Sequence, residues 1–572
     1  MPAEILIDTE QESGRYARPK RPKQSATDLT RIAESWIDEH LNLMAFVVVL
    51  AGFAIRVWAA TKNYLNPDEA LHYVLIHQPS AFMAYKASLT TAHPPLFFLI
   101  LYFWHFLGRS ELMLRLPSVL AGTAFCWLTF KWIALFFGRA AGLIGLFLAT
   151  FSPAMIGLSA EVREYALLLC CTAAALYFLG RAFQEKSSRD MWYFSGLLYL
   201  AILSHYSVAF FAITVGLYAV VRIADSKLPR RVVVPWAVGQ LGALAIYGFL
   251  YRTHLLKIKT AIPDWVIGSS FDHFYFRLGY QDYADLFDFL RENTAAIFKY
   301  MFPDGHVSQI MLLLFVAGVV LLFIRGLLPP RGAPSSCHLG ILVTVPFLAV
   351  WGAAMAGIYP YIPSRHTVFL APFCIAAMAF LLTAVVGNRL WAGLFIATVL
   401  MGFSNASANT NLTQENWRRP LMFAAMTEIQ SSIPRSDFIL VDSQSSLRLA
   451  YYLCDPKHIF RIDRSDTGFY RFWCSGYSIV ALDHLWKLTP GNLAPQAKRM
   501  AQTFGLKSGD RFWVFQAGWE ANLNTELPAH LRDFRCLSFK SFGPSITIIP
   551  FVVDQRLMPS SPTKDCVDQA TR

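Results

Sequence analysis

Long runs of apolar residues recur between residues 41 and 404, separated by short polar connections. A run of about 20 apolar residues spans a bilayer as a helix, because a helix satisfies its own backbone polar groups. The pattern predicts about eleven spanning helices, near residues 41–60, 116–137, 140–158, 165–181, 191–204, 207–222, 232–250, 309–325, 339–358, 367–386 and 390–404.

The segment 94–107, PPLFFLILYFWHFL, is apolar but short. Apolar stretches of about 10–14 residues are more often interfacial than spanning. If this segment lies on the outer surface, most basic residues of the short connections fall on the cytoplasmic side, as the positive-inside rule requires. These residues are Lys131, Arg139, Arg181, Lys186, Arg189, Arg222, Lys227, Arg230, Arg231, Arg325, Arg331 and Arg389. We therefore predict a cytoplasmic N-terminus and an extracytoplasmic C-terminal region.

The two ends of the chain differ from this transmembrane domain of residues 41–404. Residues 1–40 are polar and basic, without the short apolar core and cleavage site of a signal peptide, and are interpreted as a cytoplasmic tail. In residues 405–572, strand-like runs such as FILV at 438–441 alternate with helical stretches, which predicts a soluble α/β domain. Outside the cytoplasm, one disulfide is expected among three of its cysteines, Cys454, Cys474 and Cys536.

Composition agrees with a polytopic α-helical membrane protein. Hydrophobic residues make up 55% of the chain and charged residues 15%, against about 25% charged in soluble domains; the mean hydropathy is +0.40. The net charge of +12 does not indicate nucleic acid, because the basic residues flank apolar runs. We predict a multi-pass protein of the plasma (inner) membrane, in contact with lipid and with no nucleic-acid partner.

With this topology, every unusual polar cluster falls on the outer side, which includes outer loop one (61–115) and the long outer loop 251–308. In loop one, the adjacent carboxylates of Asp68 and Glu69 could act as a general base or hold a metal; alternatively, Asp68 caps a surface helix. His93 precedes two prolines at the start of the interfacial segment. It would lie at the height of a lipid phosphate, or it merely begins the helix.

Two arginines at span ends are candidates for binding an anion. Arg115 opens the second span, where it could reach the headgroups or hold a phosphate with its fork of donors. Arg365, beside His366, precedes the tenth span and suits an anionic headgroup.

The short connections carry further candidates. Glu161, Arg163 and Glu164 precede Tyr165 in one of them, and charges at this depth either pair structurally or face a water-filled cavity. His205 lies in a tight turn. Its ring either forms hydrogen bonds within the turn or binds a metal or the substrate. No cluster alone is specific, and no Walker loop, GxGxxG or HExxH motif points to another chemistry.

The order of the clusters resembles the GT-C glycosyltransferases of the protein O-mannosyltransferase-like superfamily, and within it the bacterial transferases that modify lipid A or core sugars with aminoarabinose or galacturonate. The matching features cover roughly residues 40–390. They are Asp68-Glu69, HPPLFF at 93–98, GRSELMLRLPSVLAGT at 108–123, SP at 152–153 with the charged stretch to Tyr165, His205-Tyr206, and SRHTVFLAP at 364–372.

The resemblance implies an inverting transferase. It would move a hexose or pentose from a polyprenyl-phosphate donor at the outer face. The acceptor would be a hydroxyl on a glycan, lipid or protein, or a lipid or glycan phosphate. Asp68 matches the catalytic carboxylate of the first loop and Glu69 its acidic neighbour. His93, Arg115 and Arg365 match positions near the phosphate of the donor lipid.

The second outer loop departs from the family pattern. Several relatives carry an Asp where this chain has Glu161 and Glu164. A possible second-loop site therefore consists of Glu161, Arg163, Tyr165 and His205. The sequence does not assign a separate role to each of these residues. A divalent metal stays open as the one cofactor, with Glu69 and His205 as candidate ligands.

Two other classes of protein compete with this interpretation. A secondary transporter would carry polar residues near the bilayer midplane and two matching halves, whereas here the charges gather at the outer rim. A carrier-lipid glycan polymerase or ligase shares the topology but transfers whole glycans. An assay with a lipid-linked monosaccharide separates it from the first interpretation.

Overall fold

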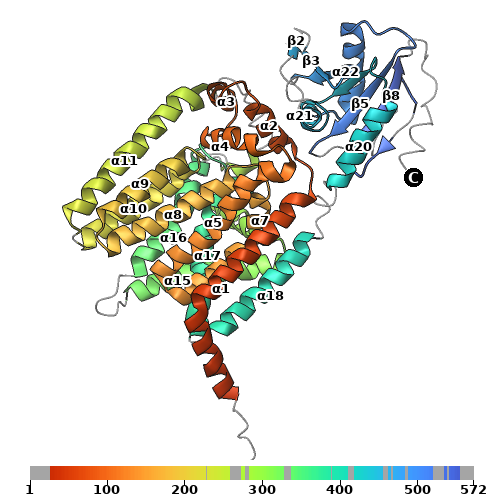
Figure 1. Ribbon diagram of the computed structural model, residues 1–572. Coiled ribbons are helices and arrows are strands. Elements are labelled where there is room, and N and C mark those ends of the chain that lie inside the picture. Colours follow the sequence, from red (N-terminus) through yellow and green to blue (C-terminus); the bar gives the residue numbers. More distant parts are fainter. Residues whose placement is uncertain are drawn as a thin grey trace, which may run out of the picture.

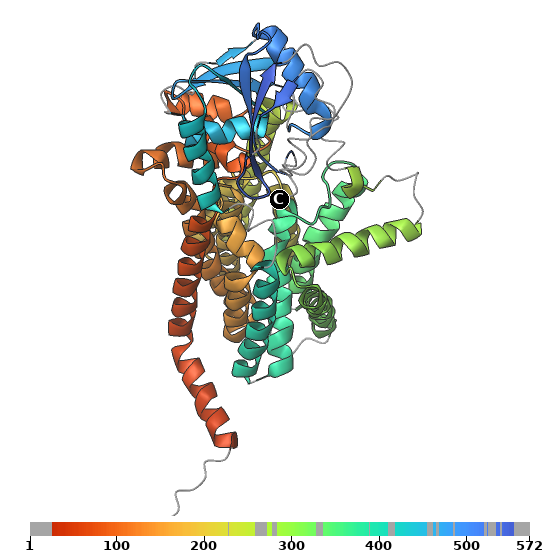
Figure 2. The same cartoon turned by 90° about the vertical axis from the view of Figure 1, so that its right-hand side faces the viewer.

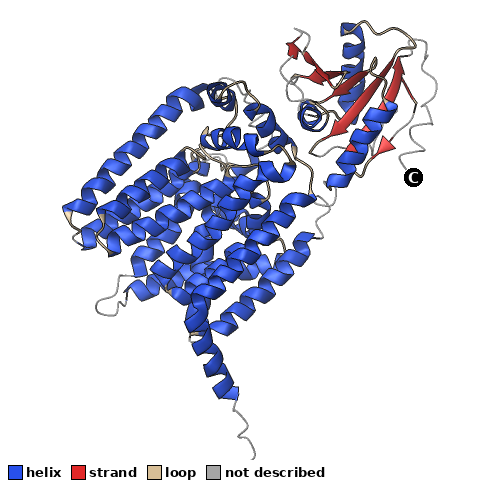
Figure 3. Cartoon of the chain, viewed as in Figure 1, coloured by secondary structure: helices blue, strands red, loops and turns tan. Residues whose placement is uncertain are grey.

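The computed structural model consists of a helical bundle and a C-terminal domain built on a β-sheet (Figures 1 and 3). The sheet domain lies at the end of the bundle that carries the short helices of outer loop one (Figure 1). The structure describes residues 26–226, 228–257, 272–276, 283–327, 336–387, 389–409, 418–454, 462–464, 468–483, 487–519, 523, 534–537 and 540–553. The basic stretch of the N-terminal tail lies outside the described residues.

Nine helices of the described chain are long and apolar enough to cross a membrane. They are α1 (Ala26–Lys62), α5 (Glu111–Phe137), α8 (Tyr165–Gln184), α10 (Val208–Ser226), α11 (Arg230–Leu250), α15 (Gly305–Leu327), α16 (Ser336–Met355), α17 (Ala371–Val386) and α18 (Leu390–Asn409). Exposed apolar side chains along α11 and α15, such as Leu244 and Leu313, suit contact with lipid. The predicted class, a polytopic α-helical membrane protein with a C-terminal α/β domain, is confirmed.

Two of the eleven expected spans differ from simple straight helices. The run at 140–158 is a bent pair, α6 (Arg139–Phe151) and α7 (Pro153–Ser159), with 62° between the two helices. The run at 191–204 becomes α9 (Ser188–Ile202), whose 15 residues are fewer than the roughly 20 needed for a span. The interfacial segment forms α4 (Leu96–Trp104) and a short η1 (His105–Leu107), again too short to be a span candidate, as predicted.

The bend between α6 and α7 depends on Pro153 and on a buried arginine. Proline has no backbone N–H, so the carbonyl of Ala149, four residues earlier, loses its helical partner. The guanidinium of Arg56, fully buried in α1, replaces it and donates to Ala149 O at 3.3 Å and to Thr150 O at 3.2 Å. The broken span then leads directly into the charged connection 160–164.

Outer loop one folds into α2 (Pro67–Ile76), α3 (Ala81–Ser88) and α4. Asn66 caps α2: its side chain accepts from Glu69 N at 3.0 Å, and Glu69 Oε2 accepts from Asn66 N at 2.9 Å. This reciprocal capping box satisfies two backbone donors that a helix start leaves free. Asp68 is therefore not the cap, and its carboxylate is available for other contacts.

The described part of the long outer loop contains η2 (Tyr251–Leu255), η3 (Asp272–Phe274) and α14 (Tyr283–Met301). Figure 2 shows α14, in lime green, extending across the bundle rather than along it. A hydrogen bond of 2.8 Å joins Thr294 on α14 to the Tyr361 hydroxyl, which ties the helix to the segment before Arg365. Residues 258–271 and 277–282 lie outside the described residues.

The C-terminal domain is an eight-stranded mixed sheet with strand order β2-β3-β4-β1-β5-β8-β6, and β7 pairs with β8. The central β1 runs parallel to β4 and β5, and the other pairings are antiparallel. Its elements are α20 (Arg419–Ser432), β1 (Phe438–Val441), α21 (Ser443–Tyr452), β2 (Ile462–Arg464), β3 (Phe469–Cys474), β4 (Tyr477–Leu482), α22 (Pro490–Thr503), β5 (Arg511–Ala517), β6 (Phe534–Cys536), β7 (Lys540–Ser541) and β8 (Ile546–Val553). The expected disulfide joins Cys454 to Cys474.

We expect Arg56→Met to destabilise the protein, because it leaves buried carbonyls at the α6–α7 break without a donor. The loss in free energy of unfolding should be at least about 2 kcal/mol. The control is Arg139→Met, which removes an exposed arginine at the start of α6 and should stay within about 0.5 kcal/mol. Thermal unfolding of the full chain in detergent measures both, and equal shifts would contradict the capping role.

Candidate functional site

Side chains from five segments meet at one end of the bundle. They come from the start of α2, the turn at His93, the connection 160–164, the turn at His205 and the segment before α17. Eight of the nine predicted site residues lie in one network of ion pairs, hydrogen bonds, ring contacts and close charges. Arg115 joins it only through Glu69.

Asp68 lies between two guanidinium groups. Its Oδ2 is 2.5 Å from Arg365 Nη2 and 3.3 Å from Arg163 Nη1. Burial opposes ionisation of this carboxyl, but the two arginines outweigh it and hold its pKa at about 2. Asp68 is therefore a permanent anion that keeps two cations side by side.

Glu69 and Arg115 form a bidentate pair, with both N···O distances 2.8 Å. The remaining donors of Arg115 bind three carbonyls of the segment that leaves α1, those of Ala60, Asn63 and Tyr64. All five N–H groups of this buried guanidinium are thus occupied by protein oxygens. Arg115 is placed to hold loop one in position, and not to make the phosphate contact that we expected.

Glu164 is the most deeply buried acid of the site. His93 Nδ1 lies 2.9 Å from its Oε1 and His72 Nε2 lies 3.3 Å from its Oε2. Burial disfavours its charge, but His93 and Arg163 outweigh burial and hold the pKa of Glu164 well below its usual range. Burial lowers the pKa of His93, although Glu164 opposes that change.

Arg163 connects the two acidic centres. Besides Asp68, its guanidinium contacts His93 Nε2 and the Tyr165 hydroxyl, both at 3.4 Å. The guanidinium of Arg365 lies 6.0 Å from the centre of the Tyr165 ring. Tyr165, the first residue of α8, therefore lies near both guanidinium groups.

His205 presents one ring nitrogen to the site. Its Nδ1 accepts a hydrogen bond from Ser207 N at 3.1 Å, so in the neutral ring Nε2 carries the proton. Burial, together with His93, lowers the pKa of His205 to about 3. The ring contacts His93 and Tyr165, with centroid distances of 5.7 and 5.2 Å. His205 is thus a neutral donor directed at the cluster.

Glu161 differs from the other acids of the site. Its Oε2 is buried and has no hydrogen-bond partner. Burial raises the pKa of Glu161 to about 7, and the nearby carboxylate of Glu69 adds to the rise. A carboxyl whose pKa lies near neutrality can exchange a proton under physiological conditions.

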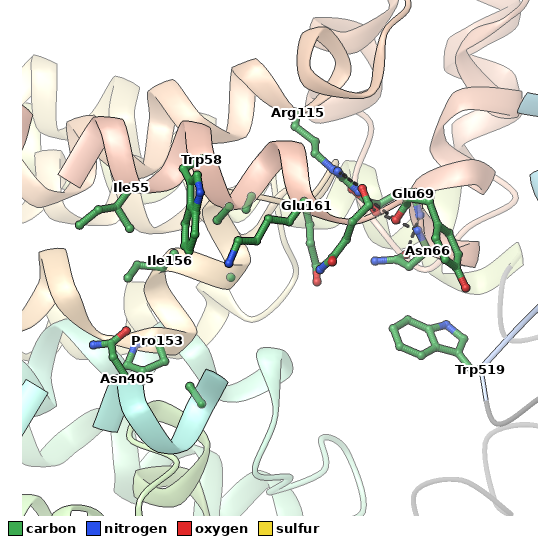
Figure 4. A pocket seen from close by; sticks show the side chains of 17 residues that line it. Ile55, Trp58, Asn66, Glu69, Arg115, Pro153, Ile156, Glu161, Asn405 and Trp519 are labelled. Carbon is green, nitrogen blue, oxygen red and sulfur yellow. Dashed lines mark hydrogen bonds and ion pairs between the residues drawn. The ribbon is translucent and has the colours of Figure 1, made fainter. Parts of the chain in front are cut away.

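A cavity of 330 Å³ adjoins Glu161 on the side of α1, α7 and α18. Figure 4 shows Trp58 and Trp519 on opposite sides of Glu161. Trp519 belongs to the C-terminal domain, so both parts of the protein line the cavity.

Residues 92–251 match the model of the family described as dolichyl-phosphate-mannose-protein mannosyltransferase. Over these residues the chain is similar to that family. The matched segment contains His93, Arg115, Glu161, Arg163 and His205, and it indicates a membrane glycosyltransferase. No curated protein matches the sequence.

Solved structures with some similarity come from three organisms. An oligosaccharyltransferase of Archaeoglobus fulgidus, in complex with Zn and sulfate, shares 16% identity over 68% of this chain, with a TM-score of 0.41. The chain spans only 56% of that protein. ArnT of Cupriavidus metallidurans shares 13% identity over 91% of this chain and 98% of its own, with a TM-score of 0.43. The S. cerevisiae protein O-mannosyltransferase complex shares 16% over 41% of this chain and 36% of its own, with a TM-score of 0.30.

A divalent metal fits this site poorly. Among the described residues, His93, Glu164 and His205 bring candidate ligand atoms within 4.8 Å of one another. However, Nδ1 of His205 accepts from Ser207 N, which leaves a protonated nitrogen toward the site, and Arg163 lies 4.0 Å from Glu164 Oε1. Both oxygens of Glu69 are already occupied. Neither candidate metal ligand of the sequence is free for that role.

Sequence reasoning did not include His72 and His366 in the site, and it left Glu164 without a role. His72 lies one helical turn after Asp68, and its Nδ1 is 2.8 Å from Asp68 O. The spacing of four residues along α2 was the available signal for it. The ring of His366 approaches Tyr165, with centroids 6.3 Å apart, and no sequence pattern indicated this contact.

We expect strong coupling between Glu69 and Arg115 in a double-mutant cycle with Glu69→Gln and Arg115→Met. Removing one partner leaves the other buried and unpaired, so the coupling free energy should be about 2 kcal/mol or more. The pair Arg181–Glu185 at the surface, at 2.8 Å, serves as the control and should give a much smaller coupling, because solvent screens it. Melting curves of the purified variants supply the values. A coupling no larger than the control's would contradict the positioning role.

Proposed function

We propose that this protein transfers a monosaccharide from a polyprenyl-phosphate donor to an acceptor hydroxyl at the outer face of the membrane, with inversion. The observation that carries the proposal is the position of Asp68 between Arg163 and Arg365, at 3.3 and 2.5 Å. Two cations held together at the outer ends of spanning helices suit a lipid phosphate. The carboxylate of Asp68, beside these cations, is suited to orienting the reacting sugar.

The donor phosphate is expected to bind the guanidinium of Arg365, whose side chain is 26% exposed. Arg163 and the Nε2–H of His205 complete a set of donors on one side of Tyr165. As the bond to the phosphate breaks, negative charge grows on its oxygens, and fixed donors stabilise that charge without reorganising. His93 contacts Arg163 and Glu164, so we assign it to positioning Arg163.

The reaction is a single displacement. The acceptor oxygen bonds to the anomeric carbon, the bond from that carbon to the phosphate oxygen breaks, and its electron pair leaves with the lipid phosphate. The acceptor proton goes to a carboxylate. Asp68 is adjacent to the cations, but a pKa of about 2 makes it a weak base; Glu161, with a pKa of about 7, is better matched to proton transfer near neutrality. We assign Asp68 to orienting the reacting groups and Glu161 to accepting the proton.

The topology belongs to the same proposal. The N-terminus would be cytoplasmic and the C-terminal domain extracytoplasmic, in the plasma membrane, with the donor reaching the site from the outer leaflet. The contacts around Asp68 do not distinguish among acceptors whose free hydroxyl belongs to a glycan, a lipid or a protein. None of the steps described uses a metal or another cofactor.

We expect Asp68→Asn to abolish sugar transfer while the protein stays folded, because the neutral amide no longer holds Arg163 and Arg365 together. The loss in rate should be about a hundredfold or more. Purified protein is offered a panel of radiolabelled polyprenyl-phosphate monosaccharides with acceptor extracts. Asp288→Asn, at an exposed carboxylate of α14, is the matched control and should retain full activity.

Full activity of Asp68→Asn would remove this carboxylate from the site. If wild-type protein consumes no lipid-linked monosaccharide, the whole-glycan transferase and transporter interpretations take precedence.

The pH profile of transfer separates the two candidate bases. Glu161 must be deprotonated to accept a proton, so kcat/KM should rise with pH through about 7 and level off above it. Glu161→Gln should lower the rate by about a hundredfold and flatten this rise. If Asp68 were the proton acceptor, the profile would stay flat between about pH 5.5 and 8.5, because its pKa is about 2.

A further inference from the structure

His254 lies in η2, the turn that joins α11 to the long outer loop. This turn is π-helical, a rare conformation that is often found at functional sites. The side chain of His254 is fully buried, so each ring nitrogen needs a hydrogen-bond partner. Its two partners show which segments of the chain this turn holds together.

Both ring nitrogens of His254 bind protein oxygens. Nε2 lies 2.7 Å from the carbonyl oxygen of Thr91. A carbonyl only accepts, so Nε2 carries the proton and donates to it. Nδ1 is then the acceptor, and the Tyr206 hydroxyl donates to it at 2.5 Å. One neutral imidazole therefore connects the end of loop one to the turn between α9 and α10.

The two partners of His254 are close neighbours in sequence of two histidines of the site. Thr91 lies two residues before His93, and its hydroxyl oxygen accepts from His93 N at 3.4 Å. Tyr206 directly follows His205. The rings of His93 and His205 lie 5.7 Å apart between centroids. The position of His254 thus bears directly on the spacing of these two rings.

A second contact joins the same two turns beyond the histidines. Leu96 N, three residues after His93, donates to the carbonyl of Leu203, two residues before His205, at 3.1 Å. Each histidine therefore lies between two points at which its turn is held. Loss of the His254 contacts would leave each turn free to pivot about the Leu96–Leu203 bond.

We infer that His254 is a positioning residue for the donor phosphate, because it fixes the direction of the Nε2–H of His205 and the place of His93 beside Arg163. This inference rests on the proposed function. Both nitrogens of His254 are engaged by protein atoms, so it acts through its neighbours and not on the substrate. A shift of about 1 Å in a group that stabilises the transition state can cost about a hundredfold in rate.

Two conservative substitutions break the bond between Tyr206 and His254 from opposite sides. Tyr206→Phe removes the hydroxyl, whereas His254→Gln removes the ring acceptor and keeps an amide donor for Thr91 O. The matched control is Tyr199→Phe, which removes a buried hydroxyl that donates to Gly239 O at 3.0 Å, between α9 and α11.

The experiment measures transfer by the full chain in detergent, from the radiolabelled polyprenyl-phosphate monosaccharide that the wild type consumes. Rates are taken per monodisperse protein. We expect kcat to fall about tenfold or more in Tyr206→Phe and His254→Gln, with the KM for the donor unchanged, because the positioned donors act on charge that grows in the transition state. Tyr199→Phe should keep the wild-type kcat.

A kinetic double-mutant cycle with His205→Phe distinguishes positioning from a general loss of stability. If the Tyr206 hydroxyl acts by directing His205, its removal should change kcat by less than about threefold once the His205 donor is absent. A hydroxyl that only stabilises the fold would lower the rate by the same factor with and without that donor.

Three results would overturn the inference. Wild-type kcat in both Tyr206→Phe and His254→Gln would remove the positioning role but leave the proposed transferase intact. Equal factors in the two His205 backgrounds would show that the bond does not act through His205. Failure of the wild-type protein to use any lipid-linked monosaccharide would remove the proposed function and, with it, this assignment.

Discussion

The buried pair of Glu69 and Arg115 is the interaction on which the outer site depends. Arg115 gathers one carboxylate and three backbone carbonyls around a single guanidinium, and this fixes the chain between the end of α1 and the start of α2. Glu69 in turn accepts from the backbone N–H of Val162 at 2.8 Å, which ties the second outer loop to the first. Asp68, the neighbour of Glu69, therefore faces Arg163 and Arg365 in one orientation.

The C-terminal domain holds the same turn from the other side. Arg448 of α21 donates to Leu65 O at 3.0 Å, and Leu65 N donates to the Tyr452 hydroxyl at 2.9 Å. Tyr64 and Tyr73 of loop one share a buried apolar cluster with residues of that domain. The bundle thus supplies the charges, while both parts of the protein determine the geometry of the loop that carries Asp68. A cavity lined by Trp519 and Glu161 follows from this contact.

The spanning helices could be predicted because a bilayer demands long apolar runs, and such runs are visible in any sequence. The length of segment 94–107 correctly predicted a helix too short to be a span candidate, and the expected compartment of three cysteines correctly predicted one disulfide among them. The bend at Ser152 and the shortness of α9 were not predicted. Pro153 indicates a break, but whether the chain tolerates it depends on Arg56, which reaches the open carbonyls from another helix.

By itself, the sequence determined the class of the protein and singled out Asp68, Arg163 and Arg365 as candidates, because hydropathy and charge are local properties. Only the tertiary structure decided what each polar group does. Arg115 and Glu69 bind each other instead of a ligand, and Glu164 collects two histidines from distant loops. Glu161 keeps a buried oxygen, Oε2, without a hydrogen-bond partner. These roles depend on burial and on neighbours many residues away, which no local pattern encodes.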